Sequence, residues 1–252
     1  MTAPTRARRP LPPVVAIVGY TLRSCLPGRR WIGALLPAAA SLLFGLIATT
    51  LGDPADAAFA GVAASALFAL VMPVTCLVVG DAVLGAEVRS GAFTFTYMAP
   101  VPTWQIVLGR WVGGTLAAGG SLAIAFALAA MVAGTPESAG AVAVSGAFGA
   151  GAYVAIFIAI GCITNRAAVW SLAYVFLVER LLGSALAGIA QLSPSWQAAA
   201  AFIGLTDGRE DYFRDGIPHG TGALVRLVVI TVVALALSSA RLQRLHITGS
   251  SD

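Results

Sequence analysis

The sequence predicts an all-α membrane protein with six transmembrane helices, preceded by an amphipathic helix in the membrane interface. Of its 252 residues, 58% are hydrophobic and only 10% are charged, compared with about 25% charged residues in a soluble domain. The mean hydropathy is +0.88, so lipid is the expected solvent. Long apolar runs recur between short polar segments, and six spans of about 20 residues each would occupy nearly the whole chain.

Residues 1–30 are predicted to form a cytoplasmic tail and the interfacial helix. The first twelve residues are basic and rich in proline. The segment 13–26 is too short to span a bilayer, but its apolar side chains fall on one helical face and Arg23 and Ser24 lie off that face. A disordered tail is the alternative interpretation. The apolar face consists of Val14, Val18, Leu22 and Cys25.

Residues 31–245 are predicted to form the six-span domain, and 246–252 a second cytoplasmic tail. Pro73 lies near the inner end of the second span and should kink that helix, because proline removes an i→i−4 hydrogen bond. Gly109 and Gly113 have the G-x-x-x-G spacing that allows helices to pack closely in lipid. The predicted spans are Trp31–Leu51, Ala58–Gly80, Trp111–Ala133, Ala141–Ile163, Ala167–Ala190 and Thr221–Ala240.

The arginines predict that both termini are cytoplasmic. The net charge is +4, and most arginines fall on the inner side if the N-terminus is inside, as the positive-inside rule requires. A basic excess can also indicate nucleic-acid binding, but here the charges flank apolar segments, so no nucleic-acid partner is expected. The inner arginines are Arg6, Arg8, Arg9, Arg23, Arg29, Arg30, Arg89, Arg110, Arg166, Arg241 and Arg244.

No catalytic centre or metal site is recognisable in the sequence. The three cysteines form no C-x-x-C pair, and His219 and His246 lie in loops that we place on opposite membrane sides, so metal ligands do not cluster. No G-x-x-x-x-G-K-(S/T) phosphate loop is present. We therefore expect a non-catalytic chain that binds no cofactor, and any ATP that drives it must bind to another chain.

The inner loop at 81–104 is a candidate docking element. Glu87 and Arg89 interrupt a segment that would otherwise continue as helix, and Gly91 can end that helix in a left-handed conformation. Pro100 forces extended backbone before it. A short helix across the membrane face would result, on which a cytoplasmic partner could push. An ordinary loop without a partner explains the same local chemistry equally well.

Around this loop the chain resembles the membrane subunits of type-2 ATP-binding-cassette exporters of drugs, polysaccharides and lipids. The family signature is similar to E-x-x-x-G-(T/A)-(L/F), then a Pro-Val pair, then an apolar stretch ending in Gly-(Lys/Arg). The six-span layout also matches over nearly the full chain, although Ala92 stands where the family frequently has Thr. The matching residues are Glu87, Gly91, Ala92, Phe93, Pro100, Val101, Gly109 and Arg110.

The resemblance implies that the loop docks on a separate ATPase subunit, which would bind ATP and Mg²⁺. Two permease copies, identical or paralogous, would form a pathway across the inner membrane of a bacterium. The expected cargo is hydrophobic or amphipathic, with antibiotics or other drugs first and lipids next. The implied coupling residues are Glu87, Arg89, Gly91 and Pro100.

Glu179, Arg180 and Arg226 are charged residues within or near predicted spans. A charge at the bilayer centre costs about 2.5–3.5 kcal/mol, so Glu179 and Arg180 should either line a pathway or lie where the fifth span ends. In the second case 181–220 forms a re-entrant segment and outer loop, broken at Ser193-Pro194. Adjacent helical side chains point about 100° apart and should have different partners.

Two further interpretations of these charges remain open. Glu179 and Arg180 could serve as structural salt-bridge partners within the bundle, and Arg226 could simply snorkel to the interface. Charges within spans are also typical of a proton-coupled secondary transporter, which is the alternative function. A membrane scaffold or an integral membrane enzyme is a third reading.

Overall fold

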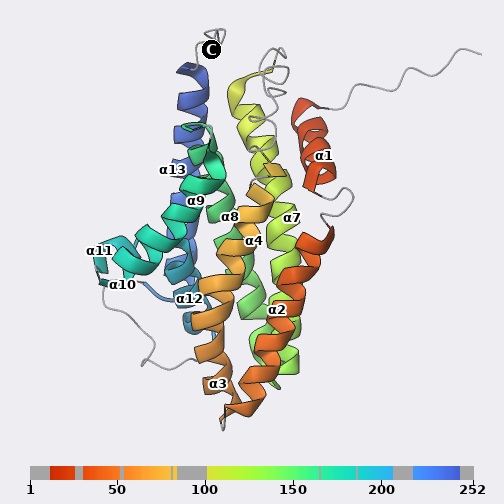
Figure 1. Ribbon diagram of the computed structural model, residues 1–252, viewed down its shortest axis with the longest axis vertical. Helices are drawn as coiled ribbons and strands as arrows, with labels where there is room; N and C mark the ends of the chain where they lie inside the picture. Colours follow the sequence, from red (N-terminus) through yellow and green to blue (C-terminus); the bar gives the residue numbers. More distant parts are fainter. Residues whose placement is uncertain are drawn as a thin grey trace, which may run out of the picture.

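The computed structural model describes residues 12–25, 31–51, 54–80, 82–83, 101–164, 166–185, 187–206 and 218–244. Across these segments every regular element is a helix, and none is a strand. The helices stand side by side as an upright bundle, with one inclined helical segment along its flank (Figure 1).

Four helices of the described segments are long and apolar enough to cross a membrane. They correspond to the second, third, fourth and sixth predicted spans, except that the third begins at Thr103 rather than Trp111. The chain is therefore an all-α protein of the membrane type. These helices are α3–η2–α4 (Ala55–Val62, Ala63–Val71, Met72–Gly80), α7 (Thr103–Val132), η4–α8 (Pro136–Ser138, Ala139–Gly161) and α13 (Thr221–Arg244).

The other two predicted spans are helical but less regular. The first corresponds to α2 (Trp31–Thr50), which contains Pro37. The fifth is divided among consecutive short helices that form the inclined flank in Figure 1. That they cross the membrane, and hence that there are six spans, stays a prediction. The divided region comprises α9 (Ala167–Ala173), η5 (Tyr174–Leu182), α10 (Gly183–Ala185) and α11 (Ala187–Ala190), and α12 (Pro194–Leu205) follows it in the chain.

The outer face of α13 is apolar, as lipid contact requires. Large aliphatic side chains remain exposed along its whole length, for example Val225, Val229, Val232 and Leu237. A soluble monomer rarely exposes a contiguous apolar face of this kind. Hydrocarbon chains around the bundle would cover it at no hydrophobic cost.

The predicted amphipathic helix is present as α1 (Pro13–Cys25), and it packs lengthwise on α7. Gly109 of α7 faces Ile17 and the Val14 carbonyl, and Gly113 faces Thr21. Because the contacts advance in the same order on both helices, α1 and α7 run in the same direction. The G-x-x-x-G spacing therefore does bring two helices into close contact. The position of α1 in the membrane interface stays a prediction.

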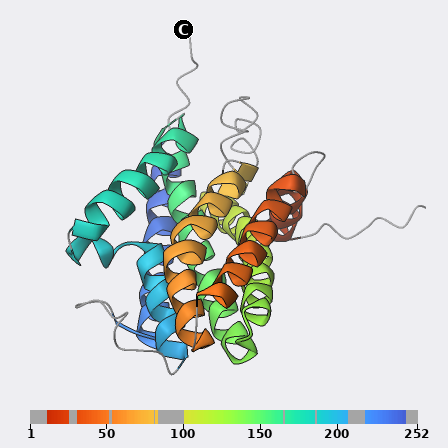
Figure 2. The same cartoon turned by 60° about the horizontal axis from the view of Figure 1, so that its bottom comes forward.

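The core extends along the bundle drawn in Figure 2, and within it aromatic rings of α3, η2, α7 and α12 pack together. Phe68 stacks edge-on against Phe126, with ring centroids 5.5 Å apart, and Phe202 lies 5.9 Å from both Phe59 and Phe68. Such aromatic pairs add about 0.5–1.5 kcal/mol each beyond area burial. They join α12 to the second predicted span, and the second span to the third.

The end of α13 and the start of α7 meet at one end of the bundle. The Gln243 side-chain amide donates to the Thr103 hydroxyl at 3.3 Å. The helix α1 lies at this same end (Figure 1). The hydrogen bond from Arg110 to the Val83 carbonyl also holds the chain just after α4 against α7.

Candidate functional site

Glu179 is the centre of a buried hydrogen-bond network. It lies on η5 and is only 1% exposed. The Tyr153 hydroxyl of α8 donates to one carboxyl oxygen, and the Ser193 hydroxyl donates to the other. The Ser195 hydroxyl lies 3.5 Å from the carboxyl oxygen that accepts from Ser193. It also lies 3.0 Å from the Ser193 hydroxyl. Both carboxyl oxygens are therefore satisfied inside the bundle, as burial of so polar a group demands.

The same network marks the beginning of α12. Ser193 is the N-cap residue of this helix, and its hydroxyl accepts from the Trp196 backbone N–H at 3.4 Å. Pro194 follows at the first helical position, where its fixed φ suits the helix and no N–H is needed. The Glu179 carboxyl thus lies at a helix N-terminus, where the helix dipole favours negative charge.

Arg180 points to a different partner from that of its neighbour. Its guanidinium donates to the backbone carbonyl of Ala69 in η2. Ala69 is four residues before Pro73, which has no N–H, so in an α-helix this carbonyl would lack its usual donor. Around it the helix is also widened: the Met72 N–H bonds five residues back, to Leu67. Arg180 therefore satisfies a carbonyl that the proline leaves open.

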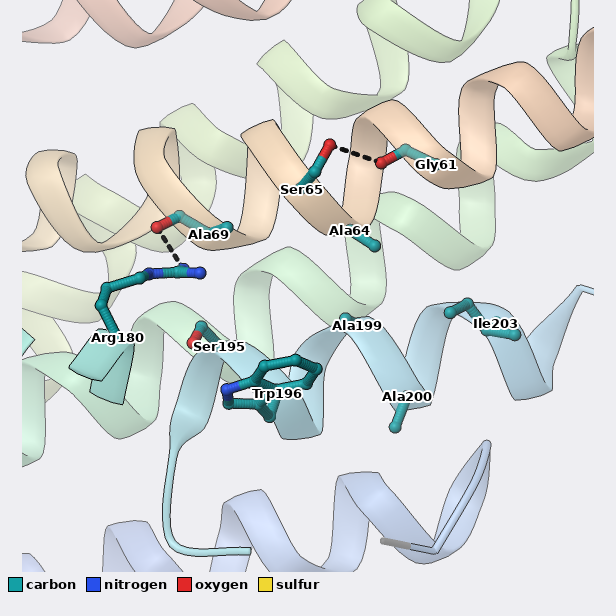
Figure 3. A pocket seen from close by; sticks show the side chains of 10 residues that line it. All are labelled: Gly61, Ala64, Ser65, Ala69, Arg180, Ser195, Trp196, Ala199, Ala200 and Ile203. Atoms are coloured by element: carbon teal, nitrogen blue, oxygen red, sulfur yellow. Dashed lines mark hydrogen bonds between the residues drawn. The ribbon is translucent and has the colours of Figure 1, made fainter. Parts of the chain in front are cut away.

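A cavity of about 400 Å³ opens beside this contact, between α3–η2 and α12 (Figure 3). Arg180, Ser65, Ser195 and the Trp196 indole supply its polar lining. The remaining lining residues are Gly61, Ala64, Ala69, Ala199, Ala200 and Ile203. The cavity thus combines one cationic group with mostly small apolar walls.

Arg226 and Arg110 occupy other places. Arg226 is half-buried on α13, about one turn from its start, and is not among the residues that line this cavity. Arg110 is only 2% exposed, and its guanidinium donates to the Val83 carbonyl at 2.5 Å. The arginine that closes the motif is thus packed inside the bundle, where it ties α7 to the chain just after α4.

The expected coupling residues lie outside the described residues. Glu87, Arg89, Gly91 and Pro100 all belong to the segment 84–100. Their assignment stays a prediction. Val83 directly precedes that segment, and its carbonyl accepts a hydrogen bond from Arg110 of α7.

Sequence reasoning missed most partners of Glu179. Ser193-Pro194 was recognised only as a helix break, and Tyr153 and Ser195 were not singled out. The available signal was weak: Tyr153 is a polar aromatic in a Gly- and Ala-rich span, and a Ser-Pro pair is a common helix start. Nothing local shows that these residues converge on one carboxylate from 26 and 14 positions away.

The arrangement holds polar groups inside an apolar bundle beside a cavity. Among the described residues, no group of three or more His, Cys, Asp or Glu side chains could hold a metal ion. Neither the protein-family models nor the curated proteins compared with this chain give a match.

Proposed function

We propose that this chain is the transmembrane permease subunit of an ATP-driven exporter of hydrophobic or amphipathic compounds. In this proposal six spans surround the pathway, both termini lie in the cytoplasm of a bacterium, and a separate ATPase supplies the energy. A second permease copy, identical or paralogous, completes the transporter. Drugs such as antibiotics are the first expected cargo, and lipids the second.

The observation that carries a transport function is the cavity beside Arg180. Ionisable groups inside spans are costly, so they mark substrate or ion pathways by default. Here such a group borders a space of about 400 Å³ between two helical segments of a membrane bundle. Ligand pockets are typically about 300–1,000 Å³, apolar, with a few placed polar groups, and this cavity fits that description.

The resemblance at 87–110 supports the choice of ATP as the energy source. Glu87, Gly91 and Pro100 match a signature that implies docking on an ATPase, and Arg110 closes it. The bond from Arg110 to the Val83 carbonyl adds a physical link. A force on the loop would reach both α4 and α7 through this buried contact, which joins them at the base of the loop.

Co-purification tests this proposal. We would express the chain with an ATP-binding-cassette ATPase encoded beside it and measure complex formation and vanadate-sensitive ATP hydrolysis. Glu87→Ala should weaken both. Glu137→Ala is the matched control, because it removes a carboxylate from η4 at the opposite end of α7 and should leave both unchanged. Equal behaviour of the two variants would remove the coupling role from Glu87.

A proton-coupled secondary transporter is the second candidate. The buried Glu179, bonded to Tyr153 and Ser193, supports it, because buried carboxylates form proton relays in pumps and transporters. Transport into liposomes under a proton gradient, with no ATPase present and lost in Glu179→Gln, would favour this candidate. Transport that needs ATP and the ATPase would favour the exporter.

A further inference from the structure

Among the residues that the structure describes, Arg180 beside the cavity has no direct acidic partner. Among the described residues the guanidinium bonds to the Ala69 carbonyl, and no carboxylate lies within ion-pair distance of it. An arginine has five N–H donors, and the Ala69 carbonyl accepts from only some of them. The carbonyl has no net charge, so it does not neutralise the guanidinium. Figure 3 shows the guanidinium facing the space between the two helices.

The neighbouring Glu179 does not fill this role. Its two carboxyl oxygens accept from Tyr153 and Ser193, and it is 1% exposed. The two side chains diverge from adjacent positions on one helix. Arg180 therefore keeps donors available toward the cavity, while Glu179 is held in the bundle core.

The rest of the lining becomes apolar away from Arg180. Ser195 lies near the guanidinium, and Ile203 lies at the other end of the labelled residues, with Ala199 and Ala200 between them (Figure 3). The space of about 400 Å³ is thus cationic at one end and apolar along its length. A ligand that matches both parts must have an anionic group joined to an apolar body.

We propose that this cavity binds an amphiphile through its anionic head group, a carboxylate or a phosphate, with the apolar part along α12. The Arg180 guanidinium forms charge-assisted hydrogen bonds to the head group, which are stronger than neutral ones. This inference names the cargo class of the proposed exporter and rests on that function only in this respect. Binding itself requires neither the ATPase nor transport.

The Trp196 indole lines the cavity and provides a reporter for the test. The protein is placed in phosphatidylcholine nanodiscs and titrated with 9,10-dibromostearic acid, whose bromines quench nearby tryptophan fluorescence. The signal from the cavity is the part of the quenching that Trp196→Phe removes. The corresponding dibromostearyl alcohol has the same chain and no charge, so it measures the apolar contribution alone.

Arg180→Gln should lower the affinity for the dibromostearic acid by about tenfold or more, as expected for the loss of a hydrogen bond to a charged group. The wild type should bind the alcohol more weakly than the acid. The affinity for the alcohol should be the same in Arg180→Gln as in the wild type. Arg166→Gln removes an exposed arginine from the N-cap of α9 on the same segment and should leave the acid titration unchanged.

A second variant tests the cavity without touching the charge. Ala64→Phe fills the space from the η2 side and should abolish the Trp196-dependent quenching by the acid. If Arg180→Gln does not fold, Ala64→Phe still tests the cavity, because Arg180 and its bond to Ala69 are retained in that variant.

The lipid composition of the nanodiscs shows whether the occupant is a resident anionic lipid or a free amphiphile. Nanodiscs of brominated phosphatidylglycerol quench Trp196 without added acid if a resident anionic lipid occupies the site. If a free amphiphile is the occupant, unbrominated phosphatidylglycerol does not compete with the acid. Either result supports an anion site. Equal affinities of acid and alcohol, or no effect of Arg180→Gln on the acid, would overturn it, whatever the co-purification with an ATPase shows.

Discussion

Glu179 and Arg180 are adjacent in the sequence, but their side chains stabilise different parts of the bundle. Glu179 joins α8 and the start of α12 through Tyr153 and Ser193. Arg180 joins η5 to η2 through Ala69. The expectation of different partners, drawn from the angle between neighbouring helical side chains, is confirmed. Their charges are used as two separate links between elements that are remote in the chain.

Glu179→Ala should destabilise the protein strongly. The change leaves the buried hydroxyls of Tyr153 and Ser193 without their common acceptor, and each unsatisfied buried group costs about 1–3 kcal/mol. Glu179→Gln retains one carbonyl oxygen as acceptor and should cost less. Thermal unfolding in detergent measures the order.

Ser65→Ala is the control for this series, because the Ser65 hydroxyl is exposed and bonds only within its own helix to the Gly61 carbonyl. Exposed changes of this kind usually stay within about 0.5 kcal/mol. If all three variants unfold at the same temperature as the wild type, the network does not contribute to stability.

The link between Arg180 and Pro73 predicts energetic coupling. Pro73→Ala gives position 73 an N–H that can bond to the Ala69 carbonyl, so this carbonyl no longer depends on Arg180. Arg180→Gln should therefore cost less stability in the Pro73→Ala background than in the wild type, with an interaction energy of about 0.5–3 kcal/mol. Unfolding in mixed micelles of the two single variants and the double variant completes the cycle. Strictly additive costs would mean that the guanidinium does not replace the missing donor.

At the scale of the helices, close packing depends on glycines at specific positions. Gly45 of α2 lies against the backbone of α7: an added Cβ would lie 2.7 Å from the Ala129 carbonyl oxygen. Gly120 lies on α7 itself, and an added Cβ there would meet nothing within 4 Å. The two positions therefore have opposite requirements although both are glycines within apolar helices.

Gly45→Ala should lower the unfolding temperature, because backbone atoms cannot move aside cheaply and overpacking costs about 1–3 kcal/mol. Gly120→Ala should be neutral or stabilising, because alanine favours the helix by about 1 kcal/mol over glycine. Both are measured by thermal unfolding in the same detergent. A loss of stability in Gly120→Ala equal to that in Gly45→Ala would show that the close contact is not the cause.

At the scale of the whole molecule, the first described helix and the end of the last one lie at the same end of the bundle (Figure 1). The start of α7, the helix α1 and the end of α13 all lie at one end of the bundle (Figure 1). The arginines of the segments around this end favour the cytoplasm. The positive-inside rule therefore predicts that this end faces the cytoplasm, and this orientation stays a prediction.

A C-terminal fusion tests this orientation. Green fluorescent protein fused after Asp252 should fluoresce, and alkaline phosphatase at the same place should be inactive, because its disulfides form only outside the cytoplasm. Alkaline phosphatase inserted at Gly208, in the predicted outer loop, should be active. Reversed activities would place the C-terminus outside and invert the predicted topology.

The sequence by itself determined the class of this protein. Composition and the length of the apolar runs made it an all-α membrane protein, because a bilayer requires long helices whose backbone groups are satisfied internally. Six spans were expected from hydropathy, and four of them correspond to described helices that are long and apolar enough to cross a membrane. The G-x-x-x-G pair also predicted a close helix contact, although not that α1 is the partner of α7.

Only the tertiary structure decided which residues meet. Tyr153, Ser193 and Ser195 converge on Glu179 from two other helices, and Pro73 is linked to Arg180 through the Ala69 carbonyl. Arg110 is buried in the bundle, where it donates to the Val83 carbonyl. Hydropathy is a local property, so it fixes which segments are helical in lipid. Pairing between segments depends on the rotation and depth of each helix in the bundle, which are set by contacts far apart in the chain.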